Sequence, residues 1–161
     1  MGWLRRKKEL SHIVVEPESD LAKQIAKELT GRTPEATFIA ELIEKGWVVV
    51  HYMNRPAFLK ERKRQYGSCW NRFGVVAWAL GNEIFVQEGK NVYEQIVHEG
   101  EHALRWIYRR STWHVKYGPF SVGKFVEEID VRRSERRFRQ ATGKRCFFRW
   151  LTDSFDVLGY L

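Results

Sequence analysis

The residues best suited to chemistry are two histidines, His98 and His102, which stand four positions apart with Glu99 directly after the first. In an α-helix of about 3.6 residues per turn, side chains at this spacing share one face, so both imidazoles can bind one metal ion. Glu99 is rotated by about 100° from His98 and faces a water on the metal instead of the metal itself. This HExxH pattern is typical of zinc-dependent hydrolysis, in which Zn2+ lowers the pKa of the water to about 7 and the carboxylate accepts its proton as general base.

The flanking residues decide between a metal site and two polar histidines on a surface helix, because the bare pattern also arises by chance. Apolar pairs at 96–97 and 103–104 enclose the pattern on both sides. A helix with apolar side chains in both flanking turns is expected to be buried. We therefore interpret the two histidines as buried zinc ligands.

The elements before this site are predicted from start and stop signals. The chain is 43% hydrophobic, which is enough for a core in a single domain that spans residues 1–161. Helices are predicted within 19–31 and 33–46, because each segment opens with an N-cap residue and closes with a glycine. The β-branched and aromatic run 47–52 predicts a buried strand, and the polar, basic segment 54–67 predicts a loop.

A hairpin and a long helix lead the chain into the HExxH pattern. The segments 74–80 and 83–87 predict two antiparallel strands that are joined by a Gly-Asn turn. Asn91 predicts an N-cap, and Glu94 a capping-box partner, for a helix that extends over 92–110.

The remaining segments complete the predicted fold. A last helix is predicted over 121–140, and the aromatic tail 147–161 is expected to pack back on the core. The predicted order is therefore two helices, three strands and two helices. This order indicates an α+β fold with a small sheet, in which the HExxH helix is followed by one more helix.

This arrangement resembles the zincin metallopeptidases, whose minimal core is a helix, a small sheet with an antiparallel edge strand along the substrate cleft, the HExxH helix and a ligand-bearing helix. The resemblance covers residues 47–140 and implies a zincin-like core with a small mixed or antiparallel sheet. It also implies a zinc-dependent metallopeptidase that hydrolyses protein or peptide bonds. A finer similarity to the small intracellular ImmA/IrrE-like and SprT-like branches is carried by the segments 67–69, 83–86, 96–99 and 102–104.

The third zinc ligand is a glutamate on the next helix in gluzincins, commonly in a Glu-x-x-Ala pattern. Glu128 is similar to this, with Val131 in place of the alanine, and the neighbouring Glu127 is the other candidate. Because a catalytic zinc normally has three protein ligands and an open position, the resemblance implies His98, His102 and Glu128 as ligands. The acid that several gluzincins carry four residues beyond the ligand has no counterpart in either register.

SprT-like proteins instead take their third ligand from a downstream histidine, and His114 could fill that role. Otherwise, His114 or Tyr117 could polarise the substrate carbonyl. Both can equally be ordinary loop residues, so the sequence leaves the third ligand open among Glu128, Glu127 and His114.

The net charge of +8 is concentrated in the Arg-rich segment 132–149. Such a segment suits phosphate contacts, so the main rival is a basic module that binds nucleic acid and has a structural or vestigial metal site. The ordinary alternative is a solvated helix face with many ion pairs. A peptidase recruited to nucleic-acid-bound protein would combine the two, as the SprT-like resemblance implies.

No segment predicts a membrane span or export. No apolar run approaches the roughly 18 residues that a span requires, and the charged start of the chain has no apolar segment behind it. Cys69 and Cys146 form no CxxC pair, which excludes a zinc ribbon but leaves a single disulfide open. We therefore expect a soluble, cytoplasmic protein with no membrane partner.

Overall fold

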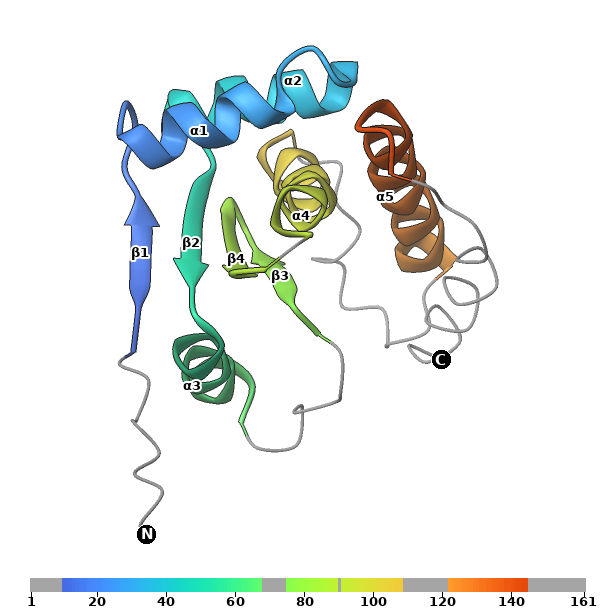
Figure 1. The fold of residues 1–161 in the computed structure, drawn as a ribbon. Helices are drawn as coiled ribbons and strands as arrows, with labels where there is room; N and C mark the ends of the chain where they lie inside the picture. Colours follow the sequence, from blue (N-terminus) through green and yellow to red (C-terminus); the bar gives the residue numbers. More distant parts are fainter. Residues whose placement is uncertain (1–9, 68–74, 90, 109–121, 145–161) are drawn as a thin grey trace, which may run out of the picture.

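The structure, a computed structural model, describes residues 10–67, 75–89, 91–108 and 122–144, so the predicted aromatic tail 147–161 lies outside the described residues. Five helices and one four-stranded sheet make up the described part, which is an α+β fold as predicted (Figure 1). None of its helices combines the length and the hydrophobicity needed to cross a bilayer. In chain order the elements are β1 (His12–Val15), α1 (Asp20–Leu29), α2 (Pro34–Glu44), β2 (Val49–Met53), α3 (Arg55–Tyr66), β3 (Ala77–Leu80), β4 (Glu83–Gln87), α4 (Val92–Ile107) and α5 (Val122–Ala141).

The sheet is mixed, with the strand order β1-β2-β4-β3. Strands β2 and β4 are parallel, whereas β1 pairs with β2, and β3 with β4, in antiparallel fashion. The turn between β3 and β4 contains Gly81 with φ 66°, a left-handed conformation that glycine adopts without steric cost. The predicted hairpin is therefore confirmed, and β3 is an end strand of the described sheet.

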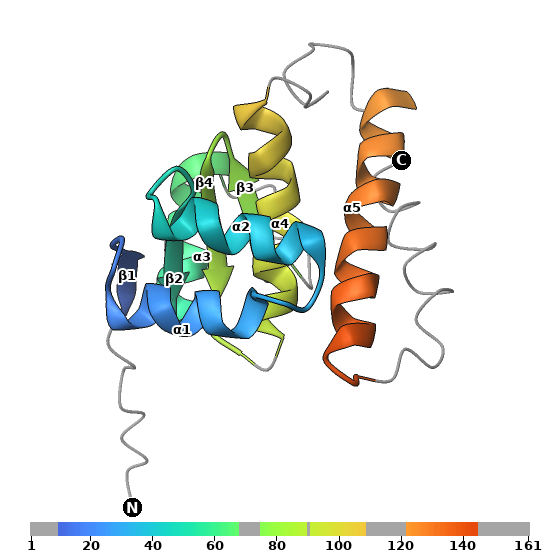
Figure 2. The same ribbon diagram turned by 90° about the horizontal axis from the view of Figure 1, so that it is seen from above.

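Side chains of the strands alternate between two cores on opposite faces of the sheet. Val50, Ile84 and Val86 belong to the larger core, which also contains residues of α1, α2 and α4. Trp78 and Phe85 belong to a smaller core together with residues of α3. Helix α3 therefore covers one face and three helices cover the other, while α5 lies beyond α4 on the side away from β1 (Figure 1, Figure 2).

The two helices predicted near the start of the chain are confirmed as α1 and α2. Ser19 and Thr33 cap them, and each side chain accepts a hydrogen bond of 3.1 Å from the backbone N–H three residues later. Gly31 and Gly46 follow the helices with φ of 76° and 71°. Both ends of each helix are thus determined by neighbouring residues, which is why the local sequence sufficed to predict them.

The segment 54–67, which we predicted as a loop, is helix α3, so that prediction is wrong. The side chain of Asn54 accepts a hydrogen bond of 3.1 Å from the backbone N–H of Ala57 and caps the helix. Ala57 and Phe58 are buried in the smaller core, and most of the basic residues face outward. The apolar stripe of α3 is narrow, and the charged residues around it concealed the helical pattern.

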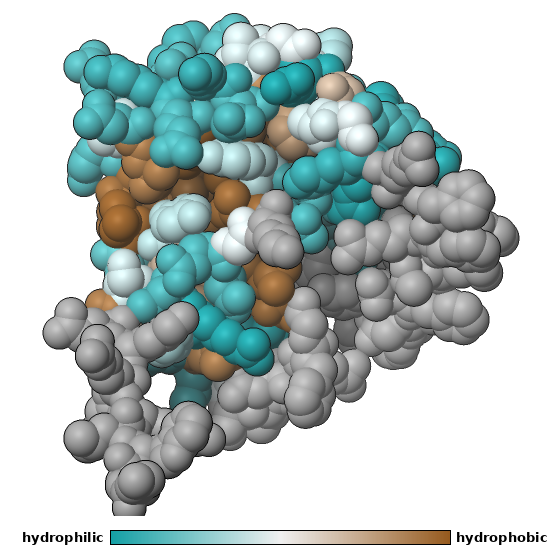
Figure 3. Space-filling model, viewed as in Figure 1, coloured by the Kyte–Doolittle hydropathy of each residue, from teal (hydrophilic) through white to brown (hydrophobic). Residues whose placement is uncertain are grey.

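Strand β1 was not predicted, so the predicted order of two helices, three strands and two helices is also wrong. Its four residues pair with β2, but only Val15 is buried, while Ile13 and Val14 are 48% and 42% exposed. A strand this short, with so little burial, has almost no alternating pattern of its own. Figure 3 shows apolar surface over β1 and β2, beneath the polar surface of α1 and α2.

Glu94 does not form the predicted capping box at the start of α4. Asn91 makes no side-chain capping hydrogen bond, and Glu94 is only 1% exposed. Its carboxylate instead binds Lys144 and Arg139 near the end of α5. The tertiary contact prevails because a buried carboxylate needs cationic partners more than an exposed helix start needs a cap.

Gly100, in the middle of the HExxH pattern, permits close packing between α4 and α2. A Cβ atom at this position would lie 2.8 Å from Cγ2 of Ile39, which is shorter than any normal contact. Helix α2 therefore holds α4 from behind, and the opposite side of α4 is left to meet α5.

Candidate metal centre

His98 and His102 lie side by side on α4, on the side of the helix that meets α5. Their ring centroids are 5.4 Å apart, with the ring planes at 66°, and both side chains are 12% exposed. Ile96 and Ala103, on the other side of the helix, are fully buried in the larger core. The apolar flanking turns thus fix the rotation of α4, and both imidazoles are largely buried as predicted.

Glu128 of α5 projects between the two imidazoles. Its Oε1 lies 3.5 Å from Nε2 of His98, and its Oε2 lies 3.3 Å from Nε2 of His102. One ligand atom from each of the three residues lies within 4.8 Å of the other two. Nε of Arg132 donates a hydrogen bond of 2.9 Å to Oε1 of Glu128 and holds this carboxylate in place.

The other ring nitrogen of each histidine is bound by a second carboxylate. Nδ1 of His98 lies 3.1 Å from Oε2 of Glu135, and Nδ1 of His102 lies 3.0 Å from Oε1 of Glu127. Because an ionised carboxylate can only accept a hydrogen bond, each Nδ1 carries the proton. The Nε2 atoms, which face Glu128, are therefore the ones available to coordinate a metal.

The carboxylates control the charge of the site. Burial alone would lower the pKa of the His102 imidazole, but its hydrogen bonds to Glu127 and Glu128 outweigh burial and raise this pKa to about 10. Burial would also lower the pKa of His98, but its hydrogen bond to Glu135 and the nearby charges of Glu99 and Glu128 together outweigh burial and raise this pKa. Burial alone would raise the pKa of Glu128, but the hydrogen bond from His102 and nearby positive charges lower it to about 2.

Glu99 is only 8% exposed, although it bears a carboxyl group. Burial raises its pKa above the ordinary value, against the opposing effect of the charges on His98 and His102. Burial and the nearby charge of Glu99 together raise the pKa of Tyr66, at the end of α3. Glu99 is thus a buried carboxyl group whose charge interacts with both histidines.

This donor set fits a zinc ion. Two neutral imidazoles and one carboxylate are a common set of protein ligands for catalytic zinc, and they leave one coordination position open. Ligating histidines in zinc sites almost always donate their second N–H to a carboxylate or carbonyl group, which orients the ring. Both features occur here, and the carboxylates around the two imidazoles supply negative charge that a divalent cation would balance.

The structure distinguishes two of the three candidates for the third ligand. Glu128 is grouped with the two Nε2 atoms, whereas Glu127 lies behind His102, at its Nδ1. His114 and Tyr117 lie outside the described residues.

Sequence analysis did not recognise the role of Glu135, or that of Glu127 as a partner of His102. The gluzincin pattern directs attention to the position four residues beyond the third ligand. Here one partner, Glu127, precedes Glu128, and the other, Glu135, lies two turns after it. The signal was present, because Glu128 and Glu135 are seven positions apart and share one face of α5. A pair of acids that faces a pair of histidines on an adjacent helix is the pattern to search for.

Most of the described basic residues of the Arg-rich segment form ion pairs within the chain. Arg132 pairs with Glu128, and Arg133 with Asp130. Further pairs connect α5 to other helices: Arg137 with Glu35, Arg139 with Glu94, and Lys144 with Glu94. These contacts match the alternative of a helix face with many ion pairs, since the acids neutralise much of the positive charge that phosphates would meet.

Comparisons of this chain with protein-family models, with curated proteins and with solved structures find no match. The function is therefore inferred from the chemistry of the site.

Proposed function

We propose that this protein is a zinc-dependent metallopeptidase with a zincin-like core, in which His98, His102 and Glu128 hold Zn2+ and Glu99 is the general base. One observation carries the proposal. The two Nε2 atoms converge on the Glu128 carboxylate, while both Nδ1 atoms are bound by other carboxylates. Histidines that were merely polar would have no reason to share one acid at Nε2 and to have separate acids at Nδ1.

The residues around the site have distinct roles in hydrolysis. Zinc bound there would supply Lewis-acid activation of a water molecule and of the substrate carbonyl. Glu99 accepts a proton from the attacking water and passes it to the leaving amine, and its raised pKa brings it closer to neutral pH, where a general base works best. Arg132 keeps the Glu128 carboxylate directed at the histidines.

The arrangement of the sheet supports a peptide as substrate. Strand β3 is an end strand, antiparallel to β4, and both strands contact α4, which carries the site. An extended peptide can add to such an edge through backbone hydrogen bonds and thereby reach a site on the adjacent helix. The zincin resemblance implies this same arrangement of edge strand and HExxH helix.

The nucleic-acid module is less well supported. Binding by phosphate contacts requires cations that are available to the ligand, but Arg132, Arg133, Arg137 and Arg139 are paired with acids of the same chain. We therefore propose that α5 serves to build the metal centre and not to bind the phosphates of a nucleic acid.

The decisive experiment measures cleavage of an unfolded protein by the full chain loaded with zinc. Glu99→Gln should retain zinc and lower turnover by about 100-fold to 10,000-fold, because an amide cannot accept the proton. Glu101→Gln is the matched control, since Glu101 is also a buried acid of the same motif but binds Ser134 and not the histidines. Its turnover should stay within about twofold of the wild type.

Two results would contradict the proposal. Cleavage that persists in Glu99→Gln would point to a contaminating protease or to another base. No cleavage by any sample, together with DNA binding at low salt that weakens steeply as salt is added, would favour the nucleic-acid module.

A further inference from the structure

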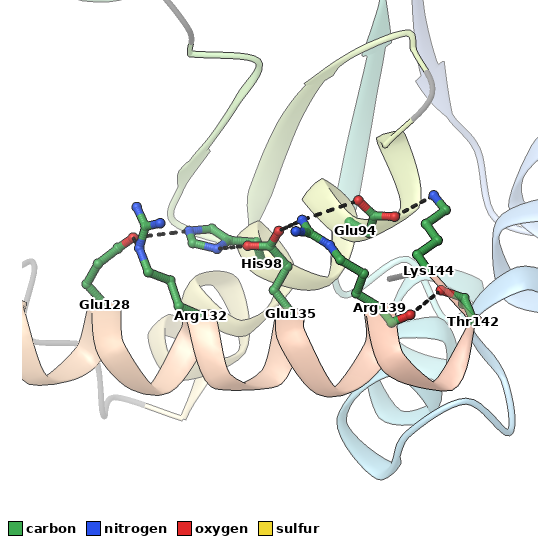
Figure 4. Close-up of polar contacts among 8 residues, drawn as sticks. All are labelled: Glu94, His98, Glu128, Arg132, Glu135, Arg139, Thr142 and Lys144. Carbon is green, nitrogen blue, oxygen red and sulfur yellow. Dashed lines mark hydrogen bonds and ion pairs between the residues drawn. The ribbon is translucent and has the colours of Figure 1, made fainter. Parts of the chain in front are cut away.

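A chain of alternating charges leads away from His98 toward the start of α4 (Figure 4). Glu135 binds Nδ1 of His98 with Oε2, and its Oε1 accepts a hydrogen bond of 2.5 Å from Nη2 of Arg139. The same Nη2 lies 3.4 Å from Oε2 of Glu94, whose Oε1 accepts from Nζ of Lys144. Each charged group in this series therefore contacts the next one.

The spacing of these residues makes the chain a double bridge between the two helices. Glu94 and His98 are one helical turn apart on α4, and Glu135 and Arg139 are one turn apart on α5. Each residue on one helix faces a partner on the other, and Arg139 also binds Glu135 on its own helix. Rotation or sliding of α5 would break two contacts at once, so the bridge fixes where Glu135 meets the imidazole.

The burial of the Glu94–Arg139 ion pair indicates a role other than stabilising the fold. Glu94 is 1% exposed and the side chain of Arg139 is 10% exposed, although each carries a full charge. Burying an ion pair is often no better for stability than packing apolar side chains of similar size, and Phe138 of α5 already belongs to the larger core together with residues of α4. The pair therefore needs an explanation beyond the stability of the fold.

The described contacts that support the two histidines differ. Glu127, which binds His102, is 2% exposed, so the residues packed around it hold it directly. The side chain of Glu135 is 16% exposed and binds Arg139. Among the described residues, the contacts that orient His98 thus extend through Glu135 to Arg139 and Glu94.

We propose that Glu94 and Arg139 are positioning residues of the metal centre: through Glu135 they hold the His98 ring so that its Nε2 points at the metal. This proposal rests on the proposed function. It deepens that function by extending the site one full helical turn beyond the ligands, to a buried acid at the start of α4.

The test compares zinc affinity in the full-length chain and in two variants that each remove one buried acid of α4. Glu94→Gln should weaken zinc binding by about tenfold. Removing residues that orient metal ligands typically lowers metal affinity by about 10-fold to 100-fold, and the lower end applies because Glu94 acts through Arg139 and Glu135. Glu101→Gln should change the affinity by less than about twofold, although it also alters a buried contact to α5. Competition with a chromophoric chelator gives the affinities, and thermal unfolding without zinc gives the stabilities.

Arg139→Lys provides a second variant in case Glu94→Gln does not fold. Lysine keeps the charge, but its ammonium group is more strongly hydrated than a guanidinium and is therefore less suited to a buried place between two carboxylates. The substitution should weaken zinc binding and change the stability of the fold only slightly. Equal changes in zinc affinity for Glu94→Gln and Glu101→Gln, or no change for both Glu94→Gln and Arg139→Lys, would overturn the proposal.

A measurement without zinc separates this proposal from the proposed function. In the metal-free chain, side-chain nitrogen NMR should show a single, sharp Nδ1 signal for His98 in the wild type and in Glu101→Gln. The same signal should broaden in Glu94→Gln, because the ring is no longer held in one orientation. If the wild type binds no zinc, the proposed function fails, and this signal alone decides whether Glu94 positions His98: broadening supports it and an unchanged signal overturns it.

Discussion

Helix α4 contacts the rest of the protein through two sides of opposite character. The side that faces α2 and the sheet is apolar and tightly packed, with Ile96 and Ala103 fully buried and Gly100 against Ile39. The side that faces α5 carries imidazoles that are bound by carboxylates. The apolar side therefore holds the helix in place by packing alone, and the polar side is left for the metal site that we propose. Stability of the fold and affinity for zinc should therefore respond to different substitutions.

The largest effect is expected when both imidazoles are removed from the polar side. The double variant His98→Ala and His102→Ala should lose zinc completely, because two of three ligands are gone. Zinc should raise the unfolding temperature of the wild type, since it binds only the folded state, and should leave that of the double variant unchanged. Elemental analysis and thermal scans measure both quantities, and stoichiometric zinc in the double variant would show that the metal binds elsewhere.

The two adjacent acids of α5 provide a sharper comparison. Glu128→Gln should weaken zinc binding by far more than about 100-fold, because it removes a ligand. Loss of a residue that only hydrogen-bonds to a ligand typically lowers metal affinity by about 10-fold to 100-fold. Glu127→Gln should weaken binding by about 10-fold to 100-fold, because it removes the partner of His102. If the order of the two effects is reversed, Glu127 is the ligand. If neither variant matters, the third ligand lies outside the described residues, where His114 is the candidate.

Zinc affinity should also depend on pH, because protons compete with the metal for the imidazoles. The pKa of His102 is raised to about 10, so at pH 7 this ring carries an extra proton at Nε2 that zinc must displace. Affinity should therefore rise by about tenfold per pH unit for that proton as pH increases toward 10. Calorimetry in buffers of different ionisation enthalpy should detect at least one proton released per zinc, and no release at pH 7 would contradict the described hydrogen bonds.

The smallest effect on the site is expected from the apolar side. Gly100→Ala places a Cβ against Ile39 and should destabilise the fold by about 1 to 3 kcal/mol through overpacking. Zinc affinity should change by less than about threefold, because the ligands lie on the opposite side of the helix. Denaturant unfolding of the metal-free chain measures the first quantity. A large loss of affinity with little loss of stability would show that the two sides of α4 are coupled.

The parts of the fold that were predictable are those that neighbouring residues determine. Ser19 and Thr33 cap helices through contacts three residues away, and the HExxH spacing places both histidines on one face by helix geometry alone. Helix α3 was missed because Asn54 and a narrow apolar stripe were outweighed by charge, and β1 because its partner strand is distant in sequence.

For the site, the sequence identified the two histidines and three candidates for the third residue, but it could not identify the residues that support them. Whether Glu127 or Glu128 faces the Nε2 atoms depends on how α5 is rotated against α4, which no local pattern specifies. Glu94 illustrates the same limit: the capping-box spacing is a local signal, and a cationic partner fifty positions away at Lys144 prevailed over it.

The third ligand candidate, Glu128, is carried by the last helix that the structure describes, and this has a kinetic consequence. Among the described elements, helix α5 contacts mainly α4, through charged pairs and through Phe138, which belongs to the larger core. Its amide hydrogens should exchange with solvent through local detachment of the helix, whereas those of α4 should wait for global unfolding. Because Glu128 leaves with α5, release of the metal and detachment of the helix become one event. The rate at which α5 detaches from α4 would then determine the lifetime of bound zinc.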